Sequence, residues 1–185
     1  MNSYFAKTTR WRIAETAIAD SFFEMALDGR LGNEGIVLWL GRDQDGRAEV
    51  THLVKLRGPL IYKCPNQIRI DPALFNEVAD VAIERKVRLL GQIHSHGSAH
   101  GLDLSFSDRS YGVKAPYYLS LVAPNYARSV VPVSACGVHV FRPTRRYLFW
   151  PGPPAYVRLT PSEVSRSLQI VLGPSLPFIT VGGQL

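Results

Sequence analysis

Cysteine is scarce in this chain: its 185 residues include only Cys64 and Cys136. Neither belongs to a Cys-x-x-Cys pair, which excludes a thioredoxin-type redox motif and a zinc knuckle. A chain of this length buries well over half of its unfolded surface without the help of disulfides. We therefore expect both thiols to lie buried as small apolar groups, in a protein of a reducing compartment.

Long apolar runs are absent as well. No window approaches the roughly 18 apolar residues that a membrane-spanning helix needs. Near the N-terminus, Glu15 and Asp20 interrupt the apolar stretch that a signal peptide would require. The sequence therefore predicts a cytoplasmic protein without a membrane partner.

Basic residues exceed acidic ones, but they are scattered along the sequence and form no cluster. The 21 Lys and Arg against 15 Asp and Glu give a net charge of +6, and no basic run is longer than two residues. No stripe of alternating basic and aromatic residues, typical of a nucleic-acid surface, is visible. With 46% apolar and 19% charged residues, the composition is that of an ordinary folded protein, and we predict no nucleic-acid partner.

Hydrophobic periodicity predicts a mixed α/β domain of about six strands and three helices. Helices are expected at 14–27, at 71–86, where Asp71 and Pro72 suit the N-cap and the first helical position, and at 105–114. Strands are expected at 34–41, 48–56, 87–96 and 117–123, followed by a hairpin pair at 137–142 and 146–150. The segment 58–66 is expected to be a loop with an extended stretch inside it.

A cluster of Pro and Gly at 151–154 breaks regular structure after the last predicted strand. We therefore place a single domain at 1–150 and a C-terminal extension at 151–185. Within the extension, residues 162–172 are predicted to be helical.

The most informative motif is a pair of histidines, His94 and His96, at the end of an apolar strand. Side chains alternate along a strand, so both imidazoles point to the same face. Asp108 follows after a loop and can return to that face. Two histidines and one carboxylate form the three-ligand set of a catalytic zinc site, which keeps one position for water. Alternatively, the histidines are only hydrogen-bonded, and Ser105 and Asp108 form a helix capping box; capping and metal binding are compatible.

Glu34 begins the first apolar strand and lies far upstream of the two histidines. A carboxylate in that place is often a solvated turn residue. In a zinc hydrolase it would act as general base, taking a proton from the metal-activated water and passing it to the leaving amine. The Ser105 hydroxyl, at the helix start, could donate a hydrogen bond to a developing oxyanion.

The order Glu34, His94-x-His96 and Ser105-x-x-Asp108 resembles the signature of the JAMM (MPN+/JAB) zinc metalloproteases, and the likeness spans roughly residues 14–150. The resemblance implies a cytidine-deaminase-like curved sheet flanked by helices. It implies one Zn²⁺ held by His94, His96 and Asp108, water activated by Glu34, and oxyanion stabilisation by Ser105. The implied reaction is hydrolysis of the isopeptide or peptide bond after the C-terminal Gly of ubiquitin or a ubiquitin-like protein.

Two features depart from the family pattern. Gly97 stands where the family usually has Pro, and eight residues, 97–104, separate the second His from the Ser where the family has seven. The longer loop leaves Asp103 open as an alternative ligand. His100, in the same loop, is either solvated or in contact with substrate.

A substrate tail would fit a narrow groove beside this loop by strand addition, with 58–66 as a candidate opposite wall. The chain's own end, Val181-Gly182-Gly183-Gln184-Leu185, is similar to a ubiquitin-type Gly-Gly tail. It is either a flexible terminus or a segment that docks on its own groove.

Three functions are compatible with these residues. The first is a small bacterial-type deubiquitinase-like hydrolase that deconjugates or matures a ubiquitin-like modifier, within an antiviral conjugation system that includes activating and conjugating enzymes. The second is a non-catalytic MPN-type scaffold, although relatives of that kind usually lose ligands. The third is a peptidase that processes a sulfur-carrier protein by the same chemistry.

Overall fold

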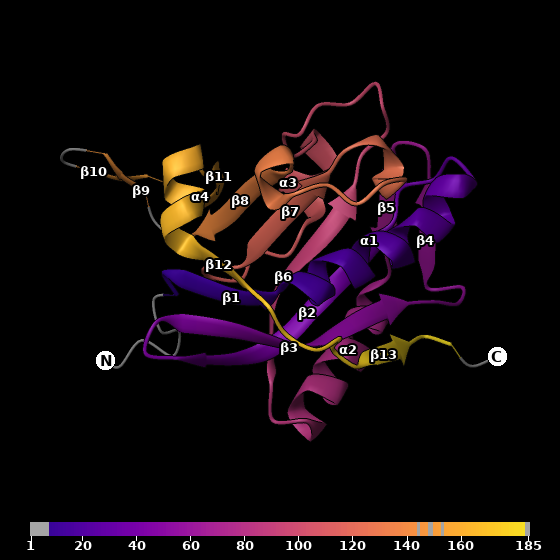
Figure 1. Ribbon diagram of the computed structural model, residues 1–185, viewed down its shortest axis with the longest axis horizontal. Helices are drawn as coiled ribbons and strands as arrows, with labels where there is room; N and C mark the ends of the chain where they lie inside the picture. The colour runs from indigo at the N-terminus through magenta and orange to yellow at the C-terminus, as the bar shows by residue number, and fades with distance from the viewer. Residues whose placement is uncertain (1–7, 144, 148–149, 153, 184–185) are drawn as a thin grey trace.

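The computed structural model describes residues 8–143, 145–147, 150–152 and 154–183, and it confirms a mixed α/β fold (Figure 1). Nine strands form the main sheet in the order β11-β8-β7-β6-β2-β3-β1-β12, with β13 also paired to β3. Their bounds are β1 Arg10–Ala14, β2 Ile36–Gln44, β3 Arg47–Leu56, β6 Arg88–Ser95, β7 Leu119–Ala123, β8 Gly137–Arg142, β11 Ala155–Arg158, β12 Leu168–Val171 and β13 Phe178–Val181.

Two helices cover opposite faces of this sheet. Alternate residues of β2 separate into two apolar clusters: Trp39 packs with residues of α1 (Glu15–Arg30), and Leu38 packs with residues of α2 (Pro72–Glu84). This is the period of two that a strand buried on both faces requires. The Asp71 side chain accepts a hydrogen bond of 2.8 Å from the Ala73 amide, so the predicted start of α2 is confirmed.

Strand β6 lies near the middle of the sheet and carries the histidine motif. It runs antiparallel to β2 and parallel to β7, with His94 opposite Ile36 on one side and Val122 on the other. After the motif comes α3 (Phe106–Tyr111), then the 3-10 turns Asn125–Ala127 and Val133–Ala135 around the end of β7. Two neighbours therefore fix the strand that presents the site.

Three expected elements differ in the structure. β1 was not predicted, although Trp11 and Ile13 are buried and alternate with exposed arginines. The extended stretch expected inside 58–66 is β4 (Ile61–Cys64), but it pairs with β5 (Gln67–Ile70), a strand that was not predicted. The hairpin of 137–142 with 146–150 is wrong: β8 pairs with β7 and β11, and β9 (Arg145–Tyr147) pairs with β10 (Trp150–Gly152). Residues 148–149 of that prediction lie outside the described part. β11, and not the predicted strand at 146–150, lies beside β8, where Tyr156 of β11 packs against Phe141 of β8.

The segment after residue 150, expected as an extension, is built into the main sheet. It supplies β11 to one edge, β12 beside β1, and β13 beside β3. Helix α4 (Pro161–Ser167) starts at a Thr160–Glu163 capping box but ends before β12 begins, so the helix does not reach residue 172 as predicted. None of the helices in the described ranges is long and apolar enough to cross a membrane.

Of the two cysteines, both are free thiols, and only Cys136 is buried as expected. Cys64 is half-buried at the end of β4. Burial raises the pKa of the Cys136 thiol to about 12, so this group stays protonated at neutral pH.

Candidate metal centre

The two histidines of the motif meet at the end of β6. His94 and His96 are only 2% and 4% exposed, and their Nε2 atoms lie 3.2 Å apart. The alternation of side chains along the strand thus brings the two imidazoles together, as the spacing predicts.

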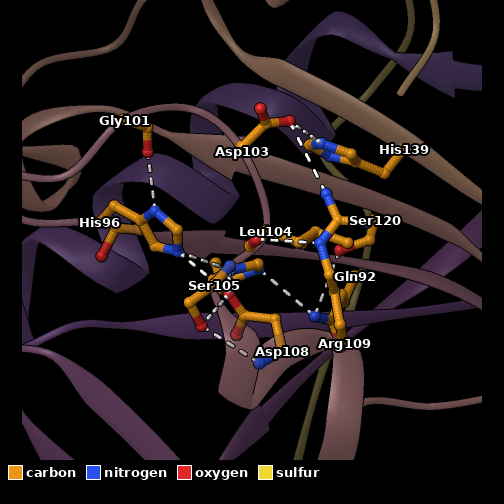
Figure 2. A network of polar contacts seen from close by, with 12 residues as sticks. Gln92, His96, Gly101, Asp103, Leu104, Ser105, Asp108, Arg109, Ser120 and His139 are labelled. Carbon is orange, nitrogen blue, oxygen red and sulfur yellow. Dashed lines mark hydrogen bonds and ion pairs between the residues drawn. The ribbon is translucent and has the colours of Figure 1, made fainter. Parts of the chain in front are cut away.

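The first turn of α3 places the Asp108 side chain next to the two histidines. Its Oδ2 atom lies 3.2 Å from Nε2 of His96 and 3.6 Å from Nε2 of His94 (Figure 2). The same oxygen accepts hydrogen bonds from the Ser105 amide at 2.8 Å and the Ser105 hydroxyl at 2.7 Å, while that hydroxyl accepts from the Asp108 amide. The capping box therefore holds the carboxylate rigidly against the histidines.

The separations between these three atoms suit a zinc ion. In a tetrahedral site with bonds of about 2.0–2.1 Å, neighbouring ligand atoms stand about 3.3 Å apart. The observed distances of 3.2, 3.2 and 3.6 Å bracket that value without any rearrangement. Within the described part of the chain, His94, His96 and Asp108 form the one group of His, Cys, Asp or Glu that could hold a metal. Two imidazoles and a carboxylate are a donor set that zinc accepts readily.

The Asp108 carboxylate already matches metal binding, and His96 does so in its neutral form; burial lowers the pKa of His96, but the neighbouring Asp108 and the Gly101 carbonyl raise it. Burial alone would raise the pKa of Asp108, but the adjoining imidazoles of His94 and His96 and the hydrogen bond from Ser105 hold it far below its usual range, so the carboxylate is ionised. Nδ1 of His96 lies 2.8 Å from the Gly101 carbonyl, which can only accept. The neutral His96 ring therefore carries its proton on Nδ1 and leaves the Nε2 lone pair free for a metal.

Glu34 lies beside this group without belonging to it. The residue is 5% exposed, and its amide donates to the Cys64 carbonyl at 3.0 Å, which ties the start of β2 to the β4–β5 hairpin. Burial raises the pKa of the Glu34 carboxyl to about 7; the charge of His96 lowers it and that of Asp108 raises it. A carboxylate of this kind, next to three ligands and half ionised near neutral pH, has the properties of a general base.

The Ser105 hydroxyl is exposed at the mouth of the site, but in this arrangement its hydrogen is directed at Asp108. Donation to an oxyanion requires the hydroxyl to rotate away from the carboxylate. The predicted role of Ser105 therefore stays a prediction.

The polar residues Asp103 and His100 of the loop 97–104 do not belong to the group of three donors. The Asp103 carboxylate lies 3.2 Å from Nε2 of buried His139 (Figure 2). It also lies 3.4 Å from Arg158. Asp103 is thus not among the group that could hold a metal, and the alternative that it replaces Asp108 is wrong for this structure. His100 is exposed, with its ring centroid 6.1 Å from that of His96.

The absence of a side chain at Gly97 leaves room for the Tyr126 ring. A Cβ atom at position 97 would come within 2.5 Å of the Tyr126 hydroxyl, so a proline or any other side chain there would require the Tyr126 ring to move. The Tyr126 hydroxyl donates to the Pro65 carbonyl at 3.2 Å, and its amide donates to the His96 carbonyl at 2.7 Å. Asn125, Tyr126 and Ala127 all have positive φ, a conformation that costs about 1–2 kcal/mol per residue. This strained turn joins the metal loop to the β4–β5 hairpin, and no local sequence signal indicated it.

A cavity of about 520 Å³ opens beside the metal group, between β5 and α3. It is lined by Ile36, Gln67, Ile68, Arg69, Ile70, Pro72, Phe75, Gln92, His94, Ser107, Asp108, Tyr111, Gly112 and Val113. The expected wall at 58–66 is wrong, because none of those residues lines the cavity; residues 67–70 of β5, directly after that segment, form the wall opposite α3. The C-terminal residues up to Gly183 are not part of this lining, because β13 is paired to β3 instead.

Comparisons with known proteins give information about the fold alone. No protein-family model matches the chain, and a search of curated proteins found no match. The chain is similar to the solution structure of protein DSY2949 from Desulfitobacterium hafniense, with a TM-score of 0.57 and 16% identity over 88% of this chain and 94% of that one. Since the two sequences are so different, this likeness concerns the mixed α/β architecture alone.

Proposed function

We propose that the protein is a zinc-dependent isopeptidase or peptidase of the JAMM type, with an MPN-like, cytidine-deaminase-like fold, that hydrolyses the bond after the C-terminal Gly of a ubiquitin-like modifier. The observation that carries the proposal is the set of three ligand atoms within 4.8 Å of one another next to a buried carboxyl whose pKa is raised to about 7. A scaffold protein has no need for either feature.

Each residue has a defined part in the proposed reaction. Zinc, when bound by His94, His96 and Asp108, would polarise the scissile carbonyl and acidify water. The Glu34 carboxylate takes the proton from the attacking water and delivers it to the amine nitrogen that leaves. The exposed Ser105 hydroxyl turns from Asp108 to the oxygen that gains negative charge.

The cavity supports an extended peptide as substrate. In the described part of the chain, β5 pairs only with β4, so its other edge is unpaired, and the residues of β5 line the cavity. An extended tail can pair with such an edge by strand addition, and Ile68, Ile70 and Phe75 offer apolar contacts along it. A tail that ends in Gly-Gly suits the approach to the buried histidines because it has no side chains to accommodate. The activating and conjugating enzymes of a bacterial antiviral system are the proposed partners, and the cytoplasm the proposed site of action.

Cleavage of a fusion protein tests this function. The full-length protein is incubated with a linear fusion of a ubiquitin-like domain ending in Gly-Gly to a reporter, with and without a zinc chelator. We expect cleavage after the second Gly that the chelator abolishes and added zinc restores. Glu34→Gln should lower turnover by at least 100-fold, an order of magnitude typical of losing a general base. Glu84→Gln, at the exposed end of α2, serves as the matched control and should leave turnover unchanged.

The outcomes separate the alternatives. Binding of the fusion without any cleavage would favour the scaffold function and overturn the proposal. Cleavage confined to a sulfur-carrier fusion would retain the chemistry and change the substrate. Full turnover by Glu34→Gln would remove Glu34 as the base while leaving the zinc site in place.

A further inference from the structure

A buried glutamine lies directly behind one of the proposed zinc ligands. Gln92 is 9% exposed and precedes His94 by two positions on β6, so both side chains point to the same face. Its Nε2 atom lies 3.3 Å from Nδ1 of His94 (Figure 2). Its other contacts are buried too: the amide donates to the Ser120 hydroxyl at 3.4 Å and accepts from the Tyr118 hydroxyl at 3.0 Å.

The sheet register builds this arrangement. Gln92 lies opposite Ser120 in the pairing of β6 with β7, so the two polar residues are neighbours across an otherwise apolar part of the sheet. Burying an amide and two hydroxyls costs free energy unless they are hydrogen-bonded to one another. A leucine or valine would be expected at position 92 if only packing were required.

Metal binding by His94 requires a hydrogen-bond partner for its Nδ1 atom, and Gln92 is placed to be that partner. A neutral imidazole that offers Nε2 to a metal must carry its proton on Nδ1, and that proton requires an acceptor. For His96 the acceptor is the Gly101 carbonyl. For His94, the Gln92 amide is the hydrogen-bonding neighbour of Nδ1 found among the described residues.

The amide can serve either protonation state, because its two ends exchange by a half-turn. In the arrangement seen here the NH₂ group faces Nδ1, which favours a proton on Nε2 of His94 and suits the short contact with Nε2 of His96. After a half-turn, Oε1 faces Nδ1 and accepts its proton. The hydroxyls of Tyr118 and Ser120 both donate and accept, so they can follow the rotation.

We propose that Gln92 is the positioning residue of His94: rotation of its amide turns Oε1 toward Nδ1 and so stabilises the metal-binding Nδ1-H form, while the ring releases its Nε2 proton to water and takes a proton from water at Nδ1. This inference rests on the proposed zinc site. It concerns how the site is prepared for the metal and assigns Gln92 no contact with substrate.

Histidine NMR and zinc competition test the inference on the full-length protein. In the metal-free wild type, ¹H–¹⁵N spectra should show the proton of His94 on Nε2 and that of His96 on Nδ1. One equivalent of zinc should move the His94 proton to Nδ1. Gln92→Met, which keeps the volume and removes both polar ends, should weaken zinc binding by about 10- to 100-fold in competition with a chelator.

Two further variants separate positioning from packing. Gln92→Glu supplies only acceptors, so it should retain zinc affinity within a few-fold of wild type and hold the His94 proton on Nδ1 before zinc is added. Tyr118→Phe removes one anchor of the amide and should weaken zinc binding by only a few-fold. The inference is overturned if Gln92→Met binds zinc within threefold of wild type with the same His94 tautomer, or if Gln92→Glu binds as weakly as Gln92→Met.

Failure of the zinc site is distinguishable from failure of this inference. If the wild type takes up no zinc, the proposed function fails. The metal-free spectra still decide the role of Gln92, since Gln92→Glu should place the His94 proton on Nδ1 without zinc, and a proton that stays on Nε2 in that variant contradicts the inference.

Discussion

At the scale of single residues, Glu34 shows how the surroundings of a side chain give it chemistry. Its carboxyl is nearly as buried as the apolar residues of β2, and burial raises its pKa from 4.5 to about 7. A solvated carboxylate would be a poor acceptor at neutral pH, whereas this one accepts and releases a proton in that range. Burying the carboxyl is unfavourable for folding when the group is ionised. The same burial that suits Glu34 to proton transfer therefore lowers the stability of the folded protein.

That cost is measurable in the metal-free protein. Because the folded pKa is raised, stability from Glu34 is fully present below pH 4.5 and is lost as the pH rises through about 7. Glu34→Gln should therefore be more stable than wild type by about 3 kcal/mol at pH 8, and by less than about 1 kcal/mol at pH 5. Urea unfolding with a chelator present measures both values. An equal difference at the two pH values would contradict the raised pKa, and Glu84→Gln is the control.

At the scale of elements, the site is assembled where β6, α3 and the loop 97–104 meet. The sequence predicted the two rigid parts because each has a local signal: alternation in β6 and a capping box at Ser105. The loop could not be predicted in the same way. Its course depends on Tyr126 and His139, which follow it in the sequence and contact it only after folding.

The contact between Asp103 and His139 should fix the loop that carries the Gly101 carbonyl. Asp103→Ala is expected to weaken zinc binding by a few-fold and to speed amide hydrogen exchange in 97–104, because Gly101 then holds His96 less firmly. Asp80→Ala, an exposed change on α2, is the control. Complete loss of zinc in Asp103→Ala, as expected for Asp108→Ala, would mean that Asp103 is a ligand after all.

The open edge of β5 should determine how tightly substrate binds. Ile68→Asp places a charge on the wall of the cavity, and we expect KM to rise about tenfold through the lost apolar contact, with zinc affinity unchanged. Tyr62→Asp is the control, since Tyr62 is exposed on β4 and does not line the cavity. Equal effects of the two variants would argue against substrate binding along β5.

At the scale of the whole molecule, the mixed α/β class was predictable from periodicity, but the arrangement of the sheet was not. β13 pairs with β3, and β12 with β1, although the strands of each pair lie far apart in the sequence. Periodicity describes which residues of a strand are buried and carries no information about its partner. β1 had a usable signal in its buried Trp11 and Ile13, whereas the strands after residue 150 are short and follow a Pro-rich break.

The C-terminal strand should be a structural element and not a regulatory tail. Val181 is 4% exposed, and the Arg57 amide donates to its carbonyl at 2.9 Å. Deleting residues 174–185 uncovers the outer edge of β3, so we expect a lower melting temperature and concentration-dependent aggregation. Turnover per folded molecule should not increase. A truncated chain that is as stable as the full chain but more active would show that the tail inhibits the enzyme.

The zinc content of the purified full-length protein is the most direct test of a metal centre built from His94, His96 and Asp108. Metal analysis after exposure to zinc and removal of excess should give one zinc per chain for the wild type and for Asp80→Ala, and none for Asp108→Ala. A wild type that retains no zinc, or an Asp108→Ala variant that retains it as firmly as the wild type, would contradict the account.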